Sequence, residues 1–111
     1  MRSTSSAPCR TWTRLLDALM ALADRQGELI SHAEHPWASA TFSGCRHTVT
    51  MAFSGGQAVT TGEQFVAALP DHEFALPGQI VADATIVDLS HQLIPQPFLT
   101  ITAELLLVAE S

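Results

Sequence analysis

The chain has 111 residues, 47% of them hydrophobic, and a formal net charge of −6, so one ordinary domain with a full core is expected. It contains no lysine, asparagine or tyrosine, which excludes a lysine Schiff base, a P-loop lysine and a catalytic phenol. After the first 25 residues Arg46 is the only fixed cation, against nine carboxylates, so neither nucleic acid nor an anionic membrane is expected as a partner.

The N-terminus and the cysteines indicate a cytoplasmic protein. Residues 1–10 are rich in serine and threonine and lack the apolar core of a secretion signal, so we expect a disordered tail before a single domain at residues 11–111. Cys9 and Cys45 stand far apart and outside any CxxC pair, which predicts neither a disulfide framework nor a structural zinc site. The longest apolar stretch, residues 105–109, is too short to cross a bilayer.

The first half of the chain predicts a helix followed by two strands. Apolar residues recur at intervals of three and four between Thr11 and Arg25, which is typical of an amphipathic helix, and Gly27 suits a left-handed cap at its end. After Pro36 the period changes to two, which predicts strands over residues 37–42 and 48–53. The short turn-like segment between them, residues 43–46, predicts a β-hairpin.

The second half repeats this order. Thr60 or Thr61, with an acidic or amide residue three positions later, resembles a capping box and predicts a helix that runs to Pro70. Residues 71–79 form a loop with Pro77 and Gly78 in a type II turn. Strands are predicted over residues 80–89 and 99–109, and the two prolines between them mark a connection.

The resulting order, αββαββ, predicts an α+β fold of two layers, a four-stranded antiparallel sheet with two helices on one face. Rotating the frame by one strand converts this order to βαββαβ, so the chain can be a circular permutant of a ferredoxin-like split βαβ fold. The permuted fold predicts that the strand at residues 99–109 lies between the strands at residues 80–89 and 49–53, with all neighbouring strands antiparallel. Two separate hairpins under two helices are the alternative. No stretch carries the motif of a particular family.

Five histidines are the one enrichment that points to chemistry, because neutral imidazole is a metal ligand and a general base near pH 7. The predicted first strand separates His35 from His47 by about 25 Å, so the histidines divide between two ends of the sheet. His32 and His91 are expected at the same end of the sheet as His35. The candidate catalytic residues at the other end are His47, His72, Asp71 and Glu73, with Cys45 near them; ordinary loop polarity explains the same residues.

No metal and no cofactor is expected from these spacings. His32 and His35 are three residues apart, but Pro36 prevents a helix that would align them. Neither Cys45 nor a serine lies in a nucleophile elbow, and Gly55 with Gly56 is too short to cradle a phosphate. The strand carboxylates, Asp83, Asp88 and Glu104, fit a solvated sheet surface.

The last predicted strand becomes apolar on both faces near its end. Its polar face changes from Thr100, Thr102 and Glu104 to Leu106 and Val108. Because both helices are needed for the other face, we expect Leu106 and Val108 to form an oligomer interface, most simply of a homodimer. The sequence thus predicts a homo-oligomeric module that binds a small molecule or a protein. The alternative is a small enzyme or metal-binding protein that uses His47, His72 and the neighbouring carboxylates.

Overall fold

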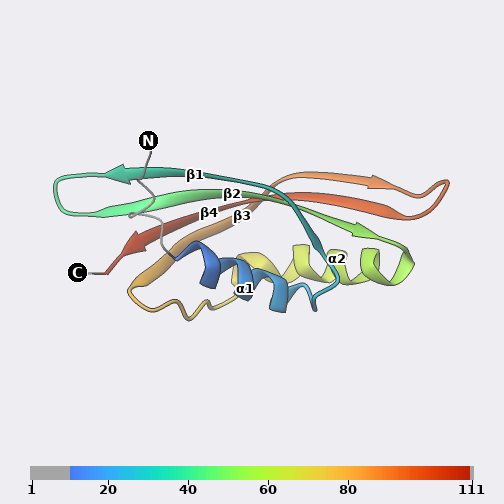
Figure 1. Cartoon of the computed structure of the whole chain (residues 1–111), viewed down its shortest axis with the longest axis horizontal. Coiled ribbons are helices and arrows are strands. Elements are labelled where there is room, and N and C mark those ends of the chain that lie inside the picture. Colours follow the sequence, from blue (N-terminus) through green and yellow to red (C-terminus); the bar gives the residue numbers. More distant parts are fainter. Residues whose placement is uncertain (1–10, 111) are drawn as a thin grey trace.

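The computed structural model describes residues 11–110, which form one four-stranded antiparallel sheet with two helices against one of its faces (Figure 1). The elements in chain order are α1 (Trp12–Leu22), β1 (Glu28–Ala38), β2 (Ser43–Ser54), α2 (Gly56–Ala68), the 3₁₀ turn η2 (Leu69–Asp71), β3 (Gln79–Gln92) and β4 (Phe98–Ala109). The predicted αββαββ order and the two-layer α+β architecture are confirmed. The tail predicted for residues 1–10 lies outside the described residues.

Strand β4 is internal, as the rotated ferredoxin-like frame predicts. The sheet has the order β1-β2-β4-β3, and each neighbouring pair is antiparallel. A central strand is covered by two neighbouring strands and by the helices, so it needs the most apolar sequence. Alternate residues of β4 are buried beneath the helices, namely Leu99, Ile101, Ala103, Leu105 and Leu107.

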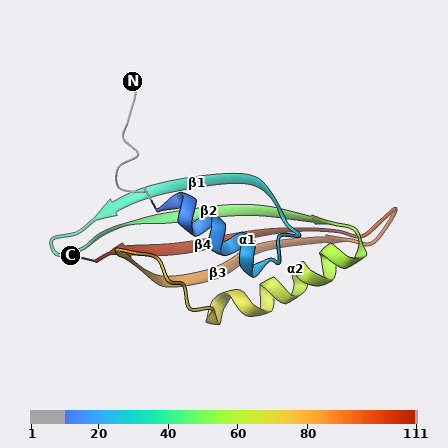
Figure 2. The same cartoon turned by 60° about the horizontal axis from the view of Figure 1, so that its bottom comes forward.

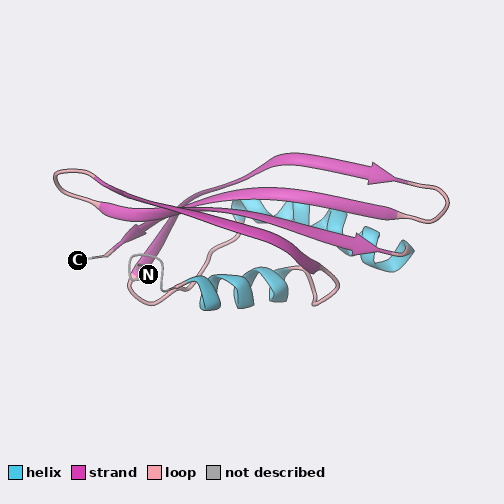
Figure 3. Ribbon diagram, turned by 45° about the horizontal axis from the view of Figure 1, so that its top comes forward, coloured by secondary structure: helices cyan, strands magenta, loops and turns pink. Residues whose placement is uncertain are grey.

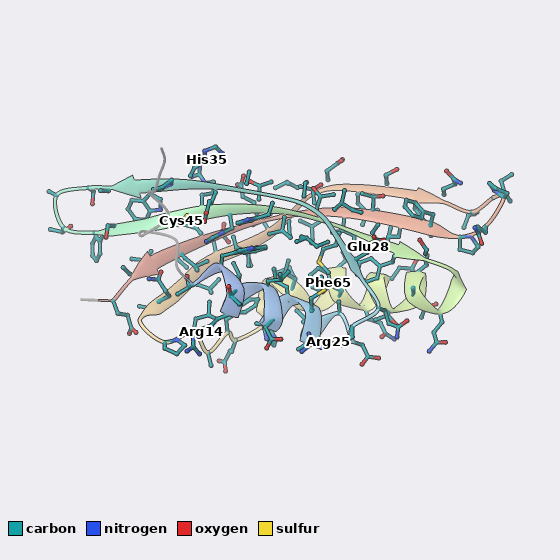
Figure 4. All side chains as sticks on the ribbon, in the orientation of Figure 1. Arg14, Arg25, Glu28, His35, Cys45 and Phe65 are labelled. Carbon is teal, nitrogen blue, oxygen red and sulfur yellow. The ribbon has the colours of Figure 1, made fainter. Side chains whose placement is uncertain are left out.

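Both helices cover the same face of the sheet (Figure 2) and build one core with it. Leu15 and Leu19 of α1 are fully buried, and Phe65 of α2 points to the sheet (Figure 4). Gly62 allows α2 to approach the sheet closely, because a Cβ atom there would lie 2.8 Å from the Leu99 side chain. The helical period of the apolar residues therefore sets which side of each helix enters the core.

The ends of both helices differ from the predictions. The left-handed residues after α1 are Asp24 and Arg25, with φ angles of 54° and 57°, so the helix ends before Gly27 can cap it. Gly27 serves packing instead, because a Cβ atom there would lie 2.8 Å from Met51 Cε. Helix α2 begins at Gly56, ahead of the predicted cap. The Thr60 hydroxyl lies inside this helix and donates a 3.0 Å hydrogen bond to the Gly56 carbonyl.

The predicted first strand is also wrong, because β1 spans Glu28–Ala38 and the hairpin turn follows at residues 39–42. In this turn the Ser39 amide donates to the Phe42 carbonyl at 2.7 Å. Pro36 lies within β1, and an edge strand tolerates proline because one of its sides has no pairing partner. By contrast, the turn predicted at Pro77 and Gly78 is confirmed, since Gly78 has a φ angle of 77°.

The two hairpins extend past the helices at opposite ends of the molecule (Figures 1 and 3). The described structure is correspondingly elongated, with extents of 50 × 33 × 20 Å. Apolar side chains at both ends reach solvent, among them Phe42, which is 60% exposed, and Ile94, which is 79% exposed. Within residues 11–110 no helix has the length and apolar character needed to cross a membrane.

Candidate functional site

Two histidines and a glutamate meet on the helix-facing side of β1 and β2. His32 and Glu34 are two residues apart on β1 and therefore share a face, and Glu34 pairs with His47 of β2. His32 Nε2 lies 2.8 Å from His47 Nδ1, and Glu34 Oε2 lies 3.9 Å from the same atom. The predicted division of the histidines between two ends of the sheet is thus wrong for His32 and His47. The misplaced first strand caused this error.

Trp12, the first residue of α1, closes the cluster from the helix side. Its ring stacks on His32 with centroids 3.4 Å apart and planes 3° apart. The Trp12 and His47 centroids are 5.7 Å apart, with planes 16° apart. The helix start thus sets the orientation of both imidazoles.

Burial governs the charge of this cluster, which we call the His32–His47 site and define as Trp12, His32, Glu34 and His47. The His47 side chain has no exposed surface. Burial and, to a lesser extent, the neighbouring His32 together lower the pKa of His47 to about 4. Burial also lowers the pKa of His32, although Glu34 opposes that effect. His47 is therefore neutral at pH 7, and its contact with Glu34 is not an ion pair.

One atom of the site lacks any polar partner. His47 Nε2 is buried and forms no hydrogen bond, whereas Nδ1 contacts His32. A buried polar atom without a partner destabilises a fold by roughly 1–3 kcal/mol. An aliphatic side chain would fill the same place without that cost, so packing alone does not explain a histidine here.

The donor atoms of His32, Glu34 and His47 converge. One nitrogen from each imidazole and one carboxylate oxygen all lie within 4.8 Å of one another, and no other such triple occurs in residues 11–110. The sequence does carry a signal for this arrangement. The spacing His-x-Glu places both side chains on one face of a strand, but residues 28–36 were not predicted to be a strand.

The structure does not bring the other candidate catalytic residues to His47. His72 packs edge-on against Phe74, with ring centroids 4.6 Å apart. Asp71 ends η2, and Glu73 follows in the loop towards β3; all three predicted residues are exposed. Between residues 11 and 110, no hydrogen bond, ion pair or ring contact joins them to His47. A catalytic role for them stays a prediction.

The remaining histidines and Cys45 belong to other surroundings. His35 projects from the face opposite the helices (Figure 4), and His91 Nδ1 lies 4.0 Å from a carboxylate oxygen of Glu63 on α2. Cys45 is disulfide-bonded, so it is neither a thiolate nucleophile nor a thiolate ligand. That bond removes the argument for a cytoplasmic setting that the cysteines supplied.

The face of the sheet opposite the helices, here the open face, carries the predicted interface residues. Leu106 and Val108 are half-buried and alternate with Leu105 and Leu107, which are buried on the helix side. Val108 pairs with Ile80 of β3, which is 51% exposed. Phe42, Ile80 and Val108 line part of a groove of about 460 Å³ at this end of the sheet.

No protein-family model matches the chain, and searches of curated proteins and of solved structures find no significant match.

Proposed function

We propose that the chain works as a homodimeric binding module whose copies associate through the open face at the end that bears Leu106 and Val108. The observation that carries this proposal is the apolar surface that these residues share with Ile80 and Phe42, of which Ile80 is 51% and Phe42 60% exposed. Contiguous apolar surface of this kind usually marks an association site. The helices cannot cover it, because they pack against the other face (Figure 3).

Charge placement favours a second copy of the same chain as the occupant. Arg46 and Asp83 pair with Leu106 from its two sides, so they lie on the open face with one strand between them. Both are exposed, and neither forms an ion pair with any other described residue. A two-fold axis along β4 would exchange the two sides of that strand. Arg46 of each copy would then face Asp83 of the other.

The alternative symmetric arrangement is disfavoured. A two-fold axis across the strands would place Arg46 opposite its own copy, and like charges in an interface cost several kcal/mol. An axis along β4 also places Leu106 against Leu106 of the second copy, which removes both from water. The groove beside Phe42 would adjoin this contact, where a small apolar ligand or a partner segment would bind.

Light scattering of untagged protein at micromolar concentration tests the association. We expect about twice the chain mass of 11.9 kDa. Leu106→Glu should shift the protein towards monomer, because the new carboxylate would have to be buried in the contact. Thr100→Glu is the matched control, since it adds the same charge to the same face of β4 but away from the apolar end. A wild-type monomer, or equal effects of both substitutions, contradicts the proposal.

A further inference from the structure

We propose that His32, Glu34 and His47 bind one divalent transition metal ion, for which Zn²⁺ is the best fit, and leave one coordination position open towards solvent. This inference goes beyond the proposed association and does not depend on it, because the site lies on the helix side of the sheet. The three donors come from paired strands, so the backbone register itself holds them together.

The distances between donors are close to those a metal requires. Two nitrogens bound to a tetrahedral Zn²⁺ at 2.0–2.1 Å each lie about 3.3 Å apart. His32 Nε2 and His47 Nδ1 are 2.8 Å apart, and Glu34 Oε2 is 3.9 Å from His47 Nδ1. These two distances must therefore each change by about 0.5 Å, and the three donor atoms together lie within 4.8 Å of one another. His32 and Glu34 lie on the edge strand β1, which can make that adjustment without moving the central strands.

The chemistry of the donors selects the class of metal. Two imidazole nitrogens with one carboxylate oxygen suit zinc and its transition-metal neighbours, whereas Mg²⁺ and Ca²⁺ prefer oxygen ligands only. Three protein ligands leave a fourth position for water or an exogenous ligand. Glu34 marks the side of access, because its side chain is 32% exposed while that of His47 is fully buried.

The surroundings of the site favour a role beyond packing. Trp12 lies flat against His32 and nearly parallel to His47, so it fixes both ring planes and covers the site from the helix side. The buried and unpartnered Nε2 atom makes His47 a costly choice for a core position. A metal bound at Nδ1 would offset that cost, because an ion that binds only the folded state stabilises that state.

The test uses the untagged full chain, freed of metal by a chelator and then titrated calorimetrically with Zn²⁺. We expect one equivalent per chain at micromolar protein. Replacing a residue that supports a metal ligand typically weakens metal binding by roughly 10- to 100-fold. Replacing the ligand itself should weaken Zn²⁺ binding by more than this. His32→Gln should accordingly weaken Zn²⁺ binding by about 100-fold or more, and Glu34→Gln by about 10-fold or more. Titration with Co²⁺ should give the intense visible bands of a four-coordinate ion, and these bands should be lost in His32→Gln.

His35→Gln is the matched control, because His35 lies on the same strand but on the opposite face. It should bind Zn²⁺ like the wild type. Both ligand variants affect partly exposed residues of an edge strand, so they should fold even where a substitution of His47 does not. Less than one equivalent bound by folded wild type, or equal losses in His35→Gln and His32→Gln, would overturn the proposal. Leu106→Glu should leave Zn²⁺ binding unchanged, which separates this inference from dimerisation.

Discussion

At the scale of single residues, His47 is the least expected member of this fold. The other residues of β2 that share its face include Val49, Met51 and Phe53, all buried and apolar. His47 continues their alternation as if it were apolar, and its burial keeps it neutral. A single polar residue in an apolar series can therefore be recognised as unusual, but its partner on the neighbouring strand depends on register.

The pH dependence of stability tests how His47 is buried. Its pKa is near 6.5 in the unfolded chain and about 4 in the fold, so between these values the unfolded state binds more protons. Above pH 6.5 the titration of His47 does not change the free energy of unfolding. As the pH falls from 6.5 towards 4, this titration lowers the free energy of unfolding by about 3 kcal/mol in total. Urea unfolding between pH 7 and pH 4, with a chelator present, measures the loss.

His47→Leu supplies the reference for that experiment, because other groups of the protein also titrate over this range. The groups that face His47 are His32 and Glu34 from β1, while α1 contributes the uncharged Trp12. We expect the wild type to lose more stability on acidification than His47→Leu does. Parallel curves for the two proteins would show that His47 is not buried as a neutral group.

At the scale of elements, the errors of prediction occur at edges and ends. The predicted start of β1 lay too far along the sequence, because Pro36 was taken as the boundary of the strand. An edge strand, however, accepts proline. The ends of α1 and α2 were misplaced because several residues near each end can serve as a cap, and tertiary contacts choose among them. The long apolar strands β3 and β4 were predicted to within a few residues.

Gly44 allows a test of how β2 pairs with β4. A Cβ atom at this position would overlap the backbone carbonyl of Leu107, so neither strand can yield without breaking the pairing. We expect Gly44→Ala to lower the free energy of unfolding by about 3 kcal/mol, at the upper end for an overpacked site. Thermal or urea unfolding followed by circular dichroism gives the value.

Gly56→Ala is the matched control for this prediction. A Cβ atom there would meet no neighbour within 4 Å, and the residue begins α2. Its effect should stay within about 0.5 kcal/mol, as for most surface substitutions. A similarly small effect of Gly44→Ala would mean that the close approach between β2 and β4 is not present in solution.

At the scale of the whole molecule, the fold leaves one sheet face without helices, and we propose that a second copy covers its apolar end. The exchange of charges in that dimer is testable. Arg46→Asp and Asp83→Arg should each weaken association about tenfold or more, because each would place like charges opposite one another. The double variant restores opposite charges and should recover the dimer.

The double variant distinguishes a specific contact from general charge effects. Each single substitution changes the net charge of the chain, whereas the double variant keeps it at −6. All three variants alter exposed side chains, so circular dichroism should report an unchanged fold. If the double variant is as monomeric as the single ones, the two-fold axis along β4 is wrong. Sedimentation velocity over a concentration series supplies the dissociation constants.

The sequence by itself determined the order of the elements and the two-layer α+β class, and it favoured the central place of β4 over two separate hairpins. These follow from local periodicity and from the length of one apolar strand, and neither requires knowledge of distant contacts. The His32–His47 site was decided only by the tertiary structure. Its donors meet because β1 pairs with β2 in one particular register, and Trp12 joins them because α1 docks across both strands. Register and docking are set by the packing of the whole core, which no local pattern of residues contains.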